Sequence, residues 1–134
     1  MSASTRTVVD EFFRRTGSAT STEEIGDLFS DDVDWHVAGD TAVVPWIGRK
    51  HGKAGAAEFY RQIRELIQSE RFEVADVLIQ GDRAIALGDL ESRVRSTGKL
   101  IQSEFAFDLT VKNGEIVRFR MFEDSFAVAQ AAVL

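Results

Sequence analysis

The strongest constraint on this chain is an asparagine-glycine pair that joins two long β-prone runs. Asn113-Gly114 lies between the runs 100–112 and 115–123. Both residues tolerate a positive φ, which the two-residue turn of a β-hairpin requires. Gly81-Asp82 is a second two-residue turn signal, and a loop with a glycine follows at 96–99. The pattern predicts a four-stranded antiparallel meander, with strands at 72–80, 84–95, 100–112 and 115–123.

A sheet of this kind needs a cover for its apolar face, and only the flanking segments can supply it. Apolar residues at helical spacing predict a helix through Val8 to Phe13 that stops at Gly17, and another over 54–68. A capping box at 21–24 predicts a short helix between them, ending at Asp31-Asp32. A short strand is expected at 33–38, a loop at 39–53 and a C-terminal helix at 126–134.

Length and charge argue against several classes of protein. The 134 residues, 44% hydrophobic and 28% charged, suit one domain over residues 1–134. The net charge of −6 argues against a nucleic acid or an anionic membrane as partner, because either would require a basic face. No apolar run approaches the roughly 18 residues of a membrane span, and the first residues lack the apolar core of a signal peptide. We therefore expect a cytoplasmic protein.

Several short motifs, in a characteristic order, carry a resemblance to a known family. They are Phe29-Ser30-Asp31-Asp32-Val33, Val44-Pro45-Trp46-Ile47-Gly48, Phe59-Tyr60, Gly81-Asp82-Arg83, Asn113-Gly114-Glu115 and Glu123-Asp124-Ser125. With this order and spacing, the chain resembles a SnoaL-like member of the nuclear transport factor 2-like, or cystatin-like, superfamily. That superfamily includes steroid delta-isomerases, polyketide cyclases and limonene epoxide hydrolase.

The resemblance implies an α+β fold. A strongly bent, mostly antiparallel sheet would form a cone around the N-terminal helices, with a short C-terminal helix after it. It also implies a deep pocket between the sheet and the helices, an apolar small molecule as ligand, and no cofactor. Homodimerisation is expected through the convex sheet face, where Phe122 lies among the charged residues Glu104, Asp108, Arg118 and Arg120.

Alternation along the strands independently predicts which residues line that pocket. Phe105 and Phe107 share one face of their strand, and Phe119 lies on the apolar face of the next. The inward face of the last strand then continues from Met121 to Glu123. The expected ligand-binding residues are Trp35, Val37, Trp46, Phe59, Tyr60, Ile63, Phe105, Phe107 and Phe119. Trp46, beside the only proline, could instead belong to a lid or an interface, and Trp35 could be plain core.

Three residues are candidates for acid-base chemistry. Glu123 would lie among apolar side chains that raise its pKa and make it useful near neutral pH, unless it is a solvated residue at a strand end. Asp89 shares a strand face with Ile85 and Leu87, and would join Glu123 in the cone if that face is inward; otherwise it faces water. His36 could relay protons or make a hydrogen bond at a sheet edge. The two histidines are not clustered with carboxylates, so no metal site is expected.

The chain departs from the steroid isomerases at their polar positions. Alignment with that pattern places the catalytic base at Val37, the helix tyrosine at Phe12 and the strand aspartate at Phe107. The resemblance therefore implies the pocket without that proton-transfer machinery. We expect a small-molecule-binding protein, possibly enzymatic with a pocket carboxylate as in an isomerase, cyclase or hydrolase. The alternative is a non-catalytic carrier or assembly module of the same fold.

Overall fold

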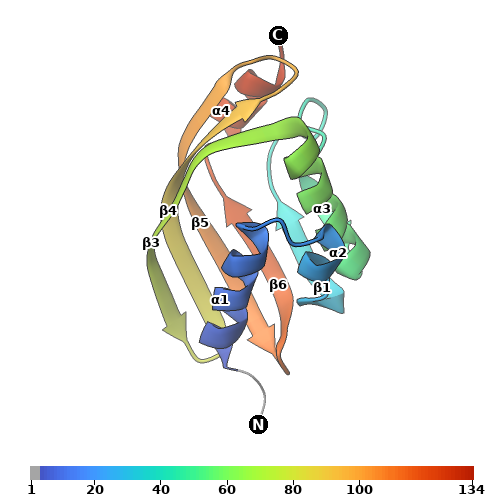
Figure 1. The fold of residues 1–134 in the computed structure, drawn as a ribbon, viewed down its shortest axis with the longest axis vertical. Coiled ribbons are helices and arrows are strands. Elements are labelled where there is room, and N and C mark those ends of the chain that lie inside the picture. Colours follow the sequence, from blue (N-terminus) through green and yellow to red (C-terminus); the bar gives the residue numbers. More distant parts are fainter. Residues whose placement is uncertain (1–3) are drawn as a thin grey trace.

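The computed structural model describes residues 4–134 and has an α+β fold (Figure 1). The elements in chain order are α1 (Thr5–Thr16), α2 (Thr22–Gly26), β1 (Phe29–Val37), β2 (Gly48–His51), α3 (Gly52–Leu66), β3 (Ile67–Gln80), β4 (Arg83–Val94), β5 (Leu100–Lys112), β6 (Glu115–Phe122) and α4 (Ser125–Ala132). The predicted fold class is thereby confirmed. Residues 1–3, part of the segment used to argue against a signal peptide, lie outside the described residues.

The six strands form one sheet in the order β2-β1-β6-β5-β4-β3. Within residues 4–134, β1 and β6 pair in parallel, and the other neighbouring strands pair antiparallel. The predicted meander corresponds to β3 through β6. Its last turn has Asn113 at φ 54° and Gly114 at φ 76°, as the two-residue hairpin signal requires.

The structure differs from the prediction at the boundaries of the sheet. β2 occupies part of the expected loop 39–53 and pairs with β1, whose start is moved back to Phe29. β3 begins at Ile67, a residue expected at the end of the preceding helix. In each case, pairing with a distant strand stabilises an extended backbone that local sequence does not demand. The parallel partner of β1, for example, lies more than 80 residues away in β6.

An aromatic core fills the space between the concave sheet face and the helices. Phe12 of α1 is fully buried, and its ring packs edge-on against those of Phe29, Phe107 and Phe119. Trp35 of β1 stacks on Phe119 with ring centroids 3.8 Å apart. These contacts hold α1 against the inner face of the sheet. Figure 1 shows α1 lying over the concave side of the sheet.

The outer sheet face carries ion pairs across neighbouring strands. Asp108 of β5 is buried and accepts hydrogen bonds from Arg83 at 2.9 and 2.7 Å and from Arg118 at 3.0 Å. The hydrogen bonds from Arg83, followed by the one from Arg118, hold the pKa of Asp108 below its usual range despite its burial. Arg118 pairs with Asp108, whereas Arg120 pairs with Asp34 of β1.

Candidate functional site

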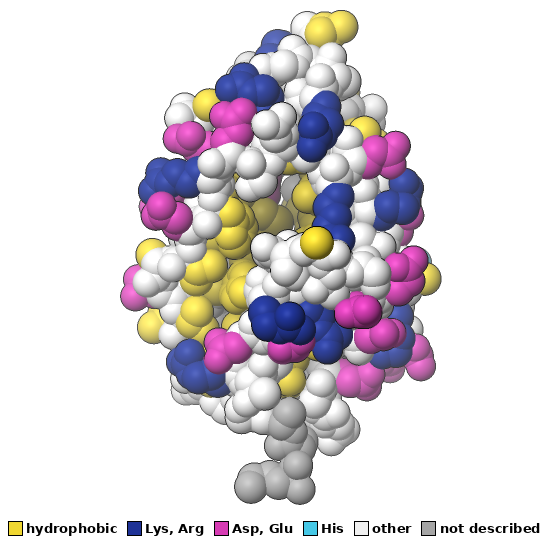
Figure 2. Space-filling model, viewed as in Figure 1, with side chains coloured by type: hydrophobic (Ala, Val, Ile, Leu, Met, Phe, Trp, Pro, Cys, Tyr) yellow, Lys and Arg dark blue, Asp and Glu magenta, His cyan; other side chains and the backbone are white. Residues whose placement is uncertain are grey.

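A cavity of about 570 Å³ opens between the concave sheet face and the helices. Figure 2 shows hydrophobic side chains gathered in the hollow, with charged side chains distributed around it. The volume lies within the range of about 300–1,000 Å³ that is typical of small-molecule sites. The walls come from α1, α3, the inner face of the sheet and the segment between β1 and β2.

Six of the nine predicted ligand-binding residues lie on the cavity wall: Val37, Trp46, Phe59, Tyr60, Ile63 and Phe107. The other three, Trp35, Phe105 and Phe119, do not. Trp35 and Phe119 cover each other's faces by stacking, and Phe105 stacks on Phe72 with centroids 4.7 Å apart. Alternation correctly places these rings on the buried side of the sheet, but none of the three lines the cavity, so they belong to the core.

The prediction missed several wall residues on elements that it did locate. Phe13 of α1 faces the cavity beside Phe107, with ring centroids 5.7 Å apart. Phe72, Leu90 and Ile101 add apolar surface from three neighbouring strands. The sequence did contain a signal for Leu90: alternation along 84–95 places it on the same strand face as the small residues Ala84 and Ala86, which indicates the inner face.

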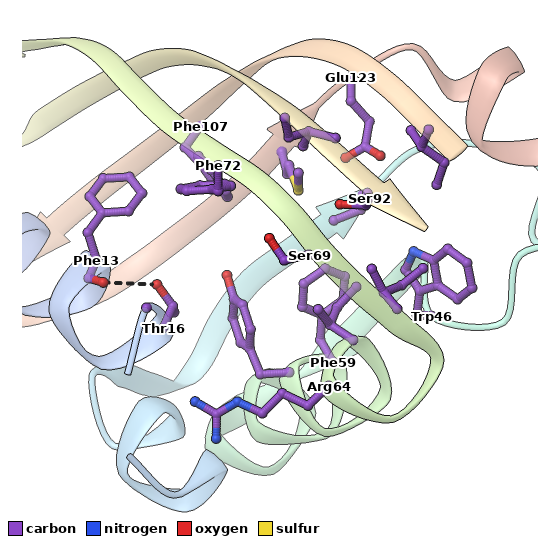
Figure 3. A pocket seen from close by; sticks show the side chains of 18 of the residues that line it. Phe13, Thr16, Trp46, Phe59, Arg64, Ser69, Phe72, Ser92, Phe107 and Glu123 are labelled. Carbon is purple, nitrogen blue, oxygen red and sulfur yellow. Dashed lines mark hydrogen bonds between the residues drawn. The ribbon is translucent and has the colours of Figure 1, made fainter. Parts of the chain in front are cut away.

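Glu123 lies at one end of the cavity, directly after β6. Its side chain is only partly exposed, and the carboxyl group points into the cavity (Figure 3). Met121 lies on the same wall, as period-2 alternation requires. Among residues 4–134, no side chain or backbone group forms a hydrogen bond or an ion pair with the Glu123 carboxyl.

The environment changes the acidity of Glu123. Burial among apolar side chains, with no compensating cation, raises its pKa to about 7 from the usual value of 4.5. A raised pKa of Glu123 is also what the sequence predicted. At neutral pH the carboxyl group therefore exists in comparable amounts as acid and as base, which suits a group that both accepts and returns a proton.

Asp89 lies outside the cavity and does not join Glu123 in the cone, so the outward one of its two possible orientations is observed. Along β4, Ala84, Ala86 and Leu90 face inward, whereas Leu87 and Asp89 face outward. Ala84 and Ala86 are buried on the side of β4 that carries Leu90, and α1 is in contact with this strand. β3 is irregular between Val74 and Asp76, opposite Gly88, whereas the pairing of β4 with β5 shows no shift of register.

On the outer face Asp89 forms an ion pair with Arg71 at 2.9 Å. It borders a shallow outer depression together with Phe122 and Glu123, so Glu123 lies between the cavity and that depression. His36 of β1 also lies on the outer face, opposite Arg49 of β2 and Arg120 of β6. Neither Asp89 nor His36 lines the cavity that Glu123 enters.

The cavity wall contains hydrogen-bond donors without protein partners. Trp46 is 5% exposed and Tyr60 9%, yet neither the indole N–H nor the phenol O–H has a partner among residues 4–134. Ser69 and Ser92, paired across β3 and β4, likewise present hydroxyl groups to the cavity (Figure 3). The wall is thus apolar in area but carries several polar atoms that a ligand can reach.

Arg64 of α3 organises one rim of the opening. Its guanidinium donates hydrogen bonds to the backbone carbonyls of Ser18 at 3.0 Å and of Thr20. These bonds fix the connection between α1 and α2 against α3, where Gly17 and Ser18 border the cavity. Arg64 therefore stabilises the entrance of the cavity, because its N–H groups donate to backbone carbonyls of the neighbouring segment.

The part of the chain that the structure describes has no group of three or more histidine, cysteine, aspartate or glutamate residues placed to hold a metal ion. None of its helices combines the length and the apolarity needed to cross a membrane. The residues that characterise the site are those of its aromatic wall, the unpartnered donors and Glu123.

Comparison with known proteins places this geometry in context. The SnoaL-like domain pattern matches residues 9–119. The fold is similar to that of an NTF2-like protein from Burkholderia xenovorans LB400, with 22% identity over 99% of this chain and 100% of the other and a TM-score of 0.87. No curated protein matches the sequence.

Two further solved structures share the fold. A candidate isomerase from Rhodopseudomonas palustris is 24% identical, with 98% of each chain covered and a TM-score of 0.80. TerC, crystallised with polyporic acid, is 19% identical over 96% of this chain and 97% of the other, with a TM-score of 0.78. At these identities the likeness shows a shared NTF2-like fold.

Proposed function

The chain belongs to the SnoaL-like domain family, and from that premise we propose that it binds an apolar small molecule and moves a proton on it with Glu123. The observation that carries the proposal is the position of Glu123: an unpaired carboxyl group at the end of an aromatic cavity. The reaction would be of the isomerase, cyclase or hydrolase kind, within a single domain and without a cofactor.

The proposed step uses both protonation states of Glu123. The carboxylate accepts a proton from an acidic C–H bond of the ligand, and the electron pair of that bond delocalises into the adjacent unsaturated group. The resulting carboxylic acid then returns the proton to the same carbon or to another. With a pKa of about 7, Glu123 is a stronger base than an ordinary carboxylate, and a large share of it is still ionised at neutral pH and able to accept the proton. The candidate isomerase among the relatives supports this class of reaction.

The proposal predicts proton exchange on a simple carbon acid. 2-Tetralone is an apolar bicyclic ketone, and the protons between its ring and its carbonyl are acidic. We expect the protein to accelerate deuterium incorporation at that carbon in D₂O, because the bound ketone lies beside Glu123. Proton NMR measures the loss of signal, and the rate should rise with pH and level off above about pH 7, where the carboxylate predominates.

Tetralin, the hydrocarbon of the same size, is the control ligand. It should inhibit the exchange by occupying the cavity. Exchange no faster than in buffer, with binding intact, would contradict proton transfer and leave the non-catalytic carrier as the better description. Exchange that tetralin does not inhibit would place the reaction outside the cavity.

We also propose a homodimer formed through the outer sheet face. Leu87, Ala106 and Phe122 are aligned across β4, β5 and β6, and Phe122 is 51% exposed. Ion pairs of Asp108 and Asp34 with arginines surround this apolar row. An apolar centre with a charged rim is typical of protein interfaces. A second copy would also cover the outer depression beside Glu123.

Sedimentation equilibrium tests the dimer directly. The wild-type protein should be dimeric at micromolar concentration, and Phe122→Glu should shift it to monomer, because a charge replaces the centre of the contact. Leu134→Glu, at an exposed C-terminal residue, is the matched control and should stay dimeric. A monomeric wild type would contradict the proposal. The cytoplasmic location and the absence of nucleic-acid and membrane partners remain predictions from the sequence.

A further inference from the structure

We infer that Ser103 of β5 is a positioning residue for Glu123: its hydroxyl group holds the backbone directly after Glu123 and thereby keeps the carboxyl group on the cavity side. The inference deepens the proposed function and rests on it, because it concerns the orientation of the same proton-transfer group. Ser103 does not line the cavity, so it would act only through Glu123.

Glu123 lies where the chain leaves the sheet. The ladder between β5 and β6 ends at the pair of Ala106 with Phe122, and α4 begins at Ser125. Pairing in a ladder fixes the face that each side chain of a strand takes, and this constraint ends one residue before Glu123. The direction of the Glu123 side chain therefore depends on how the next residue, Asp124, is held.

The hydroxyl group of Ser103 holds Asp124 from the sheet. The backbone N–H of Asp124 donates to Oγ of Ser103 at 2.9 Å, and the same hydroxyl donates to the backbone carbonyl of Glu104 at 2.6 Å. Because the hydroxyl both accepts and donates, its orientation is fixed. Alternation along β5 places Ser103 on the same face as the buried residues Ile101 and Phe105. The bond therefore ties the chain after β6 to the inner side of the sheet.

The C-terminal helix holds Asp124 from the other direction. The side chain of Asp124 caps α4 by accepting a hydrogen bond from the backbone N–H of Ala127 at 3.0 Å. The far end of α4 is also anchored, because Ala131 is buried and its carbonyl accepts a hydrogen bond from Thr97 at 2.6 Å. Glu123 is thus the one residue between the last paired residue of β6 and a backbone position that is held twice.

This position matters because Glu123 borders two hollows, the cavity and the outer depression. Figure 3 shows its carboxyl group pointing into the cavity. A small rotation of the backbone would turn the carboxyl group to the outer side, where it would not reach a ligand in the cavity. The outer depression is also lined by three further carboxylates, those of Asp76, Asp89 and Glu104.

The charges around Glu123 differ between the two sides. On the outer side Glu104 is exposed, and Asp89 pairs with Arg71. α4 carries no charged side chain, and Arg64 at the rim of the cavity donates to backbone carbonyls. Inside the cavity, burial without a compensating cation raises the pKa of Glu123 to about 7, whereas water on the outer side would lower it again. The pKa of Glu123 therefore reports on which side its carboxyl group lies.

NMR titration of the Glu123 carboxyl in the intact protein tests the inference without any ligand. In Ser103→Ala the pKa of Glu123 should fall by about 1 or more, because the carboxyl group gains access to water. Ser103→Thr keeps the hydroxyl and should keep the wild-type pKa. Ser103→Val has the shape of the threonine variant without its hydroxyl, so it should behave as Ser103→Ala does.

Ser4→Ala is the matched control. Oγ of Ser4 likewise accepts one backbone N–H, that of Thr7 at 3.1 Å, but it does so at the start of α1. Figure 1 shows that this end of α1 lies at the opposite end of the molecule from α4. Loss of this hydroxyl should leave the pKa of Glu123 unchanged, since a general loss of stability does not turn the Glu123 side chain.

Proton exchange on 2-tetralone gives a second readout. In Ser103→Ala the exchange rate at saturating ketone should fall about tenfold, because the carboxyl group is misplaced. The ketone concentration at half saturation should stay the same, since the aromatic wall is unchanged. The pH at which the rate levels off should fall together with the pKa of Glu123.

Two outcomes separate the inference from the proposed reaction. An unchanged Glu123 pKa in both Ser103→Ala and Ser103→Val would overturn the inference, even if the wild-type protein exchanges protons rapidly. A lowered pKa in these two variants, with no exchange by the wild type, would support the positioning by Ser103 and contradict the proposed reaction alone.

Discussion

Replacing Glu123 by glutamine is expected to lower the rate of proton exchange on 2-tetralone by about 10²- to 10⁴-fold, the usual contribution of a positioned general base. Glutamine keeps the size of the side chain and its position at the end of the cavity, but it cannot accept the proton. Because the aromatic wall is unchanged, affinity for tetralin should stay the same. The measurement is the exchange rate at saturating ketone, so that changes in binding do not enter.

The same substitution should change how stability depends on pH. The folded protein holds the Glu123 proton with a pKa of about 7, whereas the unfolded chain releases it near 4.5. Between these values the folded state binds more protons, so the free energy of unfolding of the wild type falls as pH rises. The loss is on the order of 3 kcal/mol by pH 7 and levels off above it. Glu123→Gln should remove this decline, as urea unfolding at pH 5 and pH 8 would show.

Asp89→Asn provides the matched control for the acid-base assignment. Asp89 faces outward and pairs with Arg71, so its substitution should leave both the exchange rate and its pH profile unchanged. A large loss of exchange in Asp89→Asn, with Glu123→Gln still active, would reverse the assignment. A Glu123 carboxyl that titrates near its usual value by NMR would contradict the proposed environment.

Phe12→Ala is expected to lower the free energy of unfolding by about 3–5 kcal/mol. Phe12 is fully buried, and its ring meets five others, those of Phe13, Phe29, Tyr60, Phe107 and Phe119. Truncation would remove apolar burial and leave a void at the junction of α1, α3 and the sheet, because surrounding rings cannot all close in. Urea denaturation monitored by circular dichroism measures the change.

Phe126→Ala is the matched surface control. Phe126 of α4 is 70% exposed, so the same truncation there should cost less than about 0.5 kcal/mol. A loss below about 1 kcal/mol in Phe12→Ala would mean that the surrounding rings repack freely around the vacant space, which would contradict the central place of Phe12 in the core. Equal losses in the two variants would likewise contradict the burial argument.

Local turn chemistry determined most of the sheet from sequence alone. The run 100–112 is observed as β5 with the predicted bounds, and Asn113 and Gly114 adopt the positive φ that their types favour. Ser21 and Asp124 cap their helices by accepting from the backbone of Glu24 and Ala127. Such features depend on residues a few positions apart, so they can be read without knowing the rest of the fold.

Pairing between distant segments was decided by the tertiary structure. β2 is four residues long and exists because β1 offers it a partner edge, and β1 itself pairs in parallel with β6. The apolar spacing at 54–68 includes Ile67, but pairing with Val94 draws that residue into β3. Hydrogen bonds across a sheet join residues far apart in the chain, so the local sequence of a segment does not determine which strand it will pair with.

For the candidate site, alternation along β6 placed Glu123 on the cavity side, because the period of two is a property of the strand itself. The same rule did not say which face of β4 is inner. In the folded protein Ala84 and Ala86 are buried, so Asp89 lies on the outer face. Whether an inward ring is wall or core depends on what covers it: Trp35 and Phe119 cover each other, whereas Trp46 and Tyr60 keep polar edges exposed to the cavity. The sequence thus determined the strands and the direction of their side chains, and only three-dimensional packing decided which of those side chains border open space.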